Sequence, residues 1–581
     1  MPPTSDRTRP KPSACWTAWA TADRGRCFLS ALTPAAPALR RRGLLPSGRG
    51  FVLALPIALL TLVPLAAVLG LALAPQAEIW GHLWQYVLPR VLANTAVLML
   101  LVGVAVLAVG VPLAWLTAMC EFPGRRFFAW ALVLPLAIPA YVLAFVQMGL
   151  FEYAGPVQAA LRDAFGSSRW FPDIRGSLWG LVLVLALAFY PYVYLLARSA
   201  FLTQGRRCIE AAQALGLSPL AAFFQVALPL ARPWIGAGLA LVLMEVLADF
   251  GAIAVFNYDT FTTALYKSWF DLHNMAAAAQ LASLLVLAVL LLVAAEQRSR
   301  RAQRFHASAA RQQRIALQGP ARWLAGGFCL LVFAAAFAVP MLQIVLWALS
   351  VWRTDLNADY WGYAWNTLFL GLVTAAVCTL LALLLAWVRR RHTDALTRWT
   401  VRLAVLGYAL PGVVLAVGVF VPIAWLDARL MAWLAPFGIE TLGILKGSLA
   451  AMLLALAARF LAVAFHATDC AMQRITRSQE DACASLGLGP WQTLRRLHLP
   501  LLRTGLLSAF LLVMVDVMKE MPITLMTRQF GWDTLAVRVF QLTSESLWDQ
   551  AALPALAIVL VGVIPVVLLM RQTERSAPGA P

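Results

Sequence analysis

Long runs of apolar residues alternate with short polar segments along most of the 581-residue chain. An α-helix needs about 20 apolar residues to cross the hydrocarbon core of a bilayer, which is roughly 30 Å thick. Strands of a membrane barrel would be short and alternating, whereas these runs are continuous. The pattern therefore predicts an all-α polytopic membrane protein of about 12 transmembrane helices. Their expected ranges are 51–74, 91–119, 127–150, 176–197, 234–256 and 276–295, then 323–351, 364–388, 403–426, 447–466, 505–527 and 551–570.

A duplication relates the first six spans to the last six. The sequence Ala-Leu-Gly-Leu-Ser-Pro at 214–219 returns as Ser-Leu-Gly-Leu-Gly-Pro at 485–490, an offset of 271 residues. Because six is even, both halves have the same orientation and are related by a pseudo-twofold axis along the membrane normal. We therefore expect two parallel six-helix repeats. Other pairs at this offset or at 272 are Gly176 with Gly447, Leu228 with Leu499, Asn94 with Asn366, and Pro139 with Pro411.

The spacing of the runs also divides the chain into five segments. Both ends and the centre are polar and basic, and the first fifty residues are rich in Pro, Ser, Ala and Arg. The expected segments are a disordered cytoplasmic tail at 1–50, a first membrane domain at 51–295, a basic cytoplasmic linker at 296–322, a second membrane domain at 323–570 and a cytoplasmic tail at 571–581.

Composition and charge narrow the class further. Hydrophobic residues make up 61% of the chain and charged residues 13%, which excludes a soluble enzyme, a disordered chain and a fibrous repeat. The formal net charge is +19, and its basic clusters fall on segments that the span order places in the cytoplasm, as the positive-inside rule requires. Both termini are then cytoplasmic. The eight cysteines show no metal-ligand spacing and no disulfide framework.

One loop between spans carries a recurring motif. A short helix is expected from Glu210 to Gly216, since glycine closes helices, and Ser218 with Pro219 begins another. An exposed helix–bend–helix of this kind suits docking into a partner's groove, or alternatively lies on the membrane surface. The same loop returns between spans ten and eleven. The residues concerned are Glu210, Ala211, Ala212, Gly216 and Pro229, then Asp481, Ala482, Cys483, Gly487 and Pro500.

With Glu-Ala-Ala, three variable residues, Gly and a later Leu-Pro, this loop resembles the coupling segment of integral-membrane permeases in binding-protein-dependent ABC importers. The second copy departs at Asp481 and Cys483, which keep the negative charge and the small size. The resemblance implies a type I importer fold in a bacterial inner membrane. It also implies two ATP-binding subunits, most simply a homodimer, and a periplasmic binding protein. The sequence holds no GxxxxGK[ST] loop, so the chain is expected to be no enzyme, and Mg-ATP to sit on the partner subunits.

Four carboxylates interrupt spans five and eleven. Side chains at i and i+4 share one helix face, and ionised groups inside a bilayer usually face a cavity or a partner. They are therefore candidates for a translocation pathway, with internal pairing to Arg459 or Lys519 as the alternative. Oxygen ligands suit hard cations, but the pattern defines no metal site. These residues are Glu245 and Asp249 in the first half, and Asp516 and Glu520 in the second.

The segments around these acids resemble the fused permeases of ferric-iron importers, which carry similar stretches near 248–252 and 519–524. Related fused permeases carry thiamine, and unfused relatives carry polyamines or phosphonates. A thiamine or polyamine permease therefore remains an alternative, as does an ion-gradient-driven secondary transporter with two parallel halves. The paired coupling loops argue against the secondary transporter. The phenols of Tyr190, Tyr192 and Tyr194 are more typical of a membrane interface than of an iron site.

Overall fold

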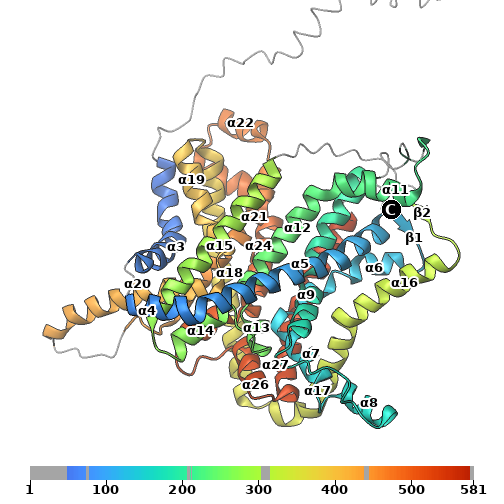
Figure 1. The fold of residues 1–581 in the computed structure, drawn as a ribbon. Helices are drawn as coiled ribbons and strands as arrows, with labels where there is room; N and C mark the ends of the chain where they lie inside the picture. The colour runs from blue at the N-terminus through green and yellow to red at the C-terminus, as the bar shows by residue number, and fades with distance from the viewer. Residues whose placement is uncertain are drawn as a thin grey trace, which may run out of the picture.

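The computed structural model describes residues 49–73, 77–205, 210, 212, 214–301, 314–437 and 444–575. Nearly all of the described chain is helical (Figure 1). The described strands are β1 (Cys120–Glu121) and β2 (Ile315–Ala316), which pair in parallel and join the linker to the first half. The expected tail lies outside the described residues up to position 48, as do the last six residues.

The expected number of spans is confirmed. In the described ranges, eleven helices are long and apolar enough to cross a bilayer, and the helix pair 125–137 and 140–165, bent by 95°, provides a twelfth. Each of the twelve overlaps one predicted range. The unbent spans contain α3 (Arg49–Ala72), α5 (Leu88–Met119), α9 (Leu178–Ala200), α12 (Leu228–Ala248), α15 (Met275–Arg301), α16 (Pro320–Phe333) with α17 (Val339–Asp355), α18 (Ala358–Arg391), α20 (Gly412–Leu434), α21 (Leu449–Gln473), α24 (Leu499–Lys519) and α27 (Trp548–Arg575).

Short elements extend or connect these spans. The bent span consists of α6 (Arg125–Ala131), a 3-10 turn η2 (Leu134–Ala137) and α7 (Ala140–Phe151), followed by α8 (Pro156–Phe165). Single π turns continue several helices, at η1 (Leu83–Val87), η3 (Phe201–Gly205), η4 (Phe223–Ala227), η5 (Ala334–Ala338) and η8 (Leu494–His498). The others are α4 (Ala77–His82), α11 (Pro219–Ala222), α13 (Gly251–Val255), α14 (Phe261–Phe270), α19 (Ala395–Ala404), η6 (Leu406–Ala409), η7 (Ala435–Phe437), α22 (Arg477–Ser485), α23 (Pro490–Thr493), α25 (Pro522–Thr527) and α26 (Leu535–Ser544).

Two spans in each half, four in all, are interrupted at equivalent positions. Pro139 and Pro411 each follow a 3-10 turn and precede the first residue of a helix, because proline lacks the amide that a continuing helix would need. Spans five and eleven were predicted as continuous, but α12 ends before Asp249 and α24 ends before Glu520. The four breaks repeat at the duplication offset, so they are a structural feature of each repeat.

The first span of each half packs against the other half. The Thr61 hydroxyl on α3 donates a hydrogen bond of 2.9 Å to the Ala404 carbonyl. A Cβ added at Gly418 would lie 2.7 Å from the Pro64 carbonyl oxygen, so α3 and α20 approach at backbone distance. In the reverse direction, the Gln147 amide donates to the Ala335 carbonyl at 3.0 Å. The two halves are therefore interlocked.

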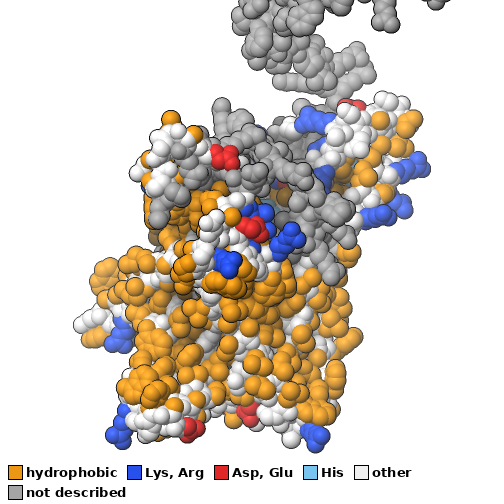
Figure 2. Space-filling view, turned by 90° about the vertical axis from the view of Figure 1, so that its right-hand side faces the viewer, with side chains coloured by type: hydrophobic (Ala, Val, Ile, Leu, Met, Phe, Trp, Pro, Cys, Tyr) orange, Lys and Arg blue, Asp and Glu red, His pale blue; other side chains and the backbone are white. Residues whose placement is uncertain are grey.

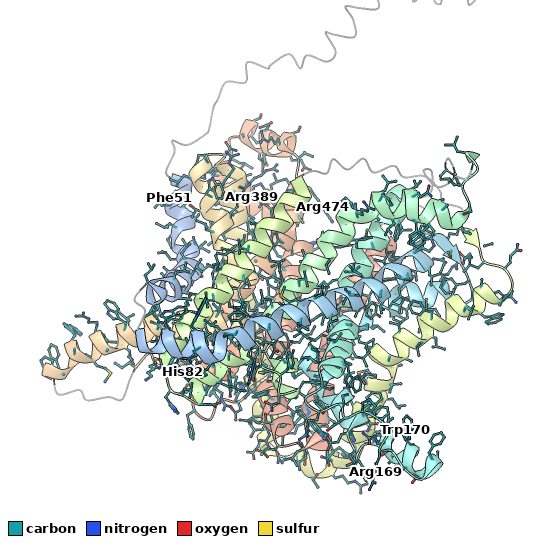
Figure 3. The ribbon with its side chains drawn as sticks, viewed as in Figure 1. Phe51, His82, Arg169, Trp170, Arg389 and Arg474 are labelled. Atoms are coloured by element: carbon teal, nitrogen blue, oxygen red, sulfur yellow. The ribbon has the colours of Figure 1, made fainter. Side chains whose placement is uncertain are left out.

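A broad belt of hydrophobic side chains separates two more polar ends of the molecule (Figure 2). One end carries α22, α11, the β1–β2 pair and the C-terminal end of the described chain (Figure 1). Phe51, Arg389 and Arg474 lie toward this end, whereas Arg169 and Trp170 lie at the opposite end (Figure 3). Both predicted coupling loops and both ends of the described chain thus share one face.

Candidate functional site: paired coupling segments and a charged cavity

Each coupling segment turns at a left-handed glycine. Gly216 has φ of +91° and Gly487 has φ of +76°, a conformation that costs a residue with a side chain more than it costs glycine. The amide after each glycine donates to a carbonyl five residues back, which is the bond that closes a Schellman turn. These bonds are Leu217 to Ala212 and Leu488 to Cys483, each 3.1 Å. The helix end predicted at each glycine is therefore a Schellman turn, and it is present in both copies.

The predicted start of the next helix is also present in the first copy. The Ser218 hydroxyl accepts a 3.2 Å hydrogen bond from the Ala221 amide and caps α11. Glu210 and Gly216 are exposed, Ala212 is buried and Pro229 is half-buried, whereas Ala211 lies outside the described residues. In the second copy, Asp481, Ala482, Gly487 and Pro500 are exposed and Cys483 is half-buried.

Two exposed leucines stand beside the signature glycines, and the sequence reasoning missed them. Leu215 is 86% exposed and Leu486 is 79% exposed, at equivalent positions of the two segments. A single exposed leucine is ordinary, but the same exposed leucine at the same place in both repeats makes the pair a candidate for contact with a partner. The signal available in the sequence was the repeated Leu-Gly pair itself.

The second segment is braced by an ion-pair network that the sequence did not reveal. Glu480 on α22 accepts a 3.1 Å hydrogen bond from the Arg390 guanidinium on α18, and the His498 Nε2 lies 3.0 Å from the same carboxylate. Arg390 also donates to the Ile475 carbonyl at 2.8 Å. The sequence analysis used the basic clusters only to predict topology.

Two adjoining cavities, of 180 and 150 Å³, lie between the halves. Glu245, Glu520, Arg459 and Lys519 line both of them. Asp516 lines the larger cavity and Asp249 the smaller one. The structure therefore brings all four predicted carboxylates to one region on the interface of the repeats. Within the described residues, no group of three or more His, Cys, Asp and Glu side chains could hold a metal ion.

Each acidic pair lines one cavity, Glu245 with Asp249 the smaller and Asp516 with Glu520 the larger, but the second acid of each pair lies just beyond the end of its helix and not within it. Asp249 and Glu520 follow the last residue of their helices in extended conformation. Each carboxylate caps the short helix that follows it, where the first backbone amides have no partner within the helix and the helix dipole is positive. Asp249 accepts from the Ala252 and Ile253 amides at 2.9 and 3.2 Å, and Glu520 accepts from the Ile523 amide at 3.2 Å.

Internal pairing, the alternative role for the acids, is observed in the second half. The Arg459 Nε lies 3.7 Å from a Glu520 oxygen. Lys519 reaches across the interface and donates to the Leu136 carbonyl at 3.4 Å. No ion pair joins Glu245 or Asp249 to another described residue.

The tyrosines divide between structural and cavity positions. Tyr190 and Tyr194 donate to the Leu132 and Ala129 carbonyls, at 2.9 and 3.0 Å, and so fasten span three to span four. Tyr192 and Tyr408 line the larger cavity, and Tyr141 lines the smaller one. The sequence analysis named Tyr192 but not Tyr141 or Tyr408. These two residues reach the interface because their spans are interrupted, which the sequence analysis did not predict.

Two interlocked repeats of six spans around a charged cavity form the architecture of a membrane permease. Residues 110–301 and 378–578 each match the family described as the binding-protein-dependent transport system inner membrane component. The chain therefore belongs to that family and carries its domain twice, as the duplication predicted.

Individual relatives are permeases for different cargoes. The Fe(3+)-transport system permease protein FbpB 2 of Haemophilus influenzae is 27% identical over 489 residues, covering 83% of this chain and 90% of the relative. The putative 2-aminoethylphosphonate transport system permease protein PhnV of Salmonella typhimurium is 29% identical over 270 residues, covering 44% and 95%. The sulfate transport system permease protein CysT of the same species is 30% identical over 227 residues, covering 37% and 77%.

Proposed function

We propose that the chain is the permease subunit of an ATP-driven importer that moves ferric iron from a periplasmic binding protein into the cytoplasm. Both termini and both coupling segments face the cytoplasm. Two ATP-binding subunits, as a homodimer, dock on the coupling segments and hold the Mg-ATP. The chain itself contributes no nucleotide site and no resident cofactor.

The observation that carries this proposal is the pair of identical coupling turns on one face. Each turn presents an exposed leucine, Leu215 or Leu486, beside a left-handed glycine. The turn in the second copy leads through η8 into one continuous helical span, Pro490–Lys519, which is 30 residues long. A displacement of the turn is therefore transmitted along a rigid rod, about 45 Å in length at 1.5 Å per residue, to the cavity acids.

Two observations support iron as the cargo. FbpB 2 aligns with both halves of the chain, whereas PhnV and CysT align with less than half of it. The cavity also gathers four carboxylates against two cationic side chains, and such a lining favours a hard cation over sulfate or a phosphonate. Thiamine and polyamines are also cations, so they are the competing cargoes that the assay must include.

The test is uptake of radioactive ferric iron by a strain that lacks this gene and carries it back on a plasmid. The binding protein and the ATPase subunit are left in place. We expect iron uptake to depend on the plasmid and to disappear when the ATPase subunit is deleted. Restored uptake of thiamine or putrescine in place of iron would reject the cargo. Uptake that survives loss of the ATPase subunit would identify a secondary transporter.

A further inference from the structure

The two walls of the cavity differ in charge although the halves are repeats. Each cationic residue on the second-half wall, and the glycine that packs against Arg459, has an alanine at the equivalent position of the first half. These alanines line the two cavities. The asymmetry is therefore at the cavity surface itself. The equivalent pairs are Arg459 with Ala188, Lys519 with Ala248, and Gly412 with Ala140.

The second-half wall balances its own charge. Arg459 lies 3.7 Å from Glu520, and Gly412 makes room for this contact. A Cβ at Gly412 would lie 2.7 Å from both the Arg459 Nη1 and the Glu520 Oε1. Lys519, one helical turn after Asp516, supplies a second positive charge. Two acids and two cations leave this wall with no net charge.

Among the residues described, the first-half wall contributes no cation of its own and has a hydroxyl group without a hydrogen-bond partner. Glu245 and Asp249 line the smaller cavity, and so does Tyr141, which is 7% exposed and whose hydroxyl makes no hydrogen bond to the described residues. Its ring is held in place, because a Cβ added at Gly251 would lie 2.7 Å from the Tyr141 Cβ. A buried hydroxyl without a partner is costly unless a ligand or an ordered water satisfies it.

We propose that the positively charged cargo moves along the first-half wall, on the oxygens of Glu245, Asp249 and Tyr141, while Arg459 and Lys519 keep the second-half acids occupied. This inference rests on the proposed function and names the residues that select its cargo. Two carboxylates and a phenol supply the oxygen ligands that a hard cation prefers. A pathway must also release what it binds.

The test compares matched changes on the two walls, measured as ferric iron uptake and as ATPase subunit recovered with the permease. Glu245→Gln should lower uptake about 10-fold, and Glu245→Asp, which keeps the charge, should retain most of it. Ala188→Arg places a cation on the first-half wall and should lower uptake as strongly, whereas Ala188→Met tests size alone and should do so less. All four variants should still recover the ATPase subunit.

On the second-half wall, Glu520→Gln leaves Arg459 unpaired and should lower uptake. Adding Arg459→Met should restore part of that loss, whereas adding it to Glu245→Gln should restore none. The inference is overturned if Glu245→Gln imports iron as well as the unmodified protein, or if the second-half double variant loses as much as Glu245→Gln. If the unmodified complex hydrolyses ATP but imports no iron, the proposed cargo is wrong and the inference falls with it.

Discussion

The duplication is preserved at the coupling face and broken at the cavity. At the coupling face, Gly216 and Gly487 have the same handedness, and an exposed leucine precedes each. At the cavity, Arg459 stands where the first half has Ala188. The two copies therefore share their turn geometry at one end of spans four and ten and differ in charge in the interior of these spans.

The difference follows from what each region is proposed to meet. A homodimer of ATPase subunits presents the same surface twice, so two equivalent docking segments are required. A single cargo that moves along the first-half wall does not meet the two halves equally, so nothing requires the walls to be equal. The repeated coupling turns are therefore what the proposed homodimer would require.

The largest expected effect comes from changing both coupling glycines. Gly216→Val and Gly487→Val each force a β-branched residue into the left-handed region, at a cost of about 1–2 kcal/mol or more per turn. We expect the double variant to lose the ATPase subunit on co-purification and to lose iron uptake. The two single variants should be impaired to a similar degree, because the turns are equivalent.

Two further glycines provide the control. Gly176 and Gly447 also have positive φ, +69° and +74°, and precede the other ends of the same two spans. Valine there strains the backbone equally, but the change should leave the ATPase subunit bound. Loss of the subunit in this control as well would attribute the effect to folding and not to docking.

The turns and the cavity also differ in how far the sequence predicts them. Gly216 and Gly487 repeat at the duplication offset, and each specifies a local turn, so the sequence was enough to locate both turns. The breaks at Asp249 and Glu520 were missed, because an apolar run continues through them and hydropathy does not register a carboxylate that caps a buried helix. The ion pair between Arg390 and Glu480 joins residues 90 positions apart, and no periodicity reports such a contact.

A smaller effect is expected from the exposed leucines. Burying a leucine in an interface contributes about 1.5–3 kcal/mol, so Leu215→Asp or Leu486→Asp should each weaken ATPase binding by a factor of about 10 to 100. Titration of the ATPase subunit onto detergent-solubilised permease measures this. Leu291→Asp is unsuitable as a control because that side chain lies within a span, whereas Thr393→Asp changes an exposed polar residue just before α19 and should bind normally. Unequal effects of the two leucines would show that the segments dock differently.

At the cavity, Gly412→Ala should have a moderate effect. The added methyl group would lie 2.7 Å from Arg459 and from Glu520, so the two side chains must separate, and overpacking of this kind costs about 1–3 kcal/mol. We expect iron uptake to fall several-fold and to recover when Arg459→Met is added. Gly236→Ala on α12 is the control, since nothing lies within 4 Å of its added Cβ. If adding Arg459→Met does not restore uptake, the loss comes from the steric displacement and not from the freed charge of Arg459.

The smallest effect should come from the brace of the second coupling segment. Arg390 and Glu480 are 22% and 25% exposed, so replacing either by Met or Gln should cost about 1 kcal/mol or less of stability, as for partly solvated ion pairs. The pair nevertheless joins α22 to α18, and His498 on η8 contacts the same carboxylate. Arg390→Met should therefore leave the ATPase subunit bound but reduce the stimulation of its hydrolysis by the loaded binding protein. Adding Glu480→Gln should cause little further loss, because both changes remove one contact. Fully additive losses would mean that the two side chains act separately. The coupling motion would then pass only through η8, which connects α23 to α24.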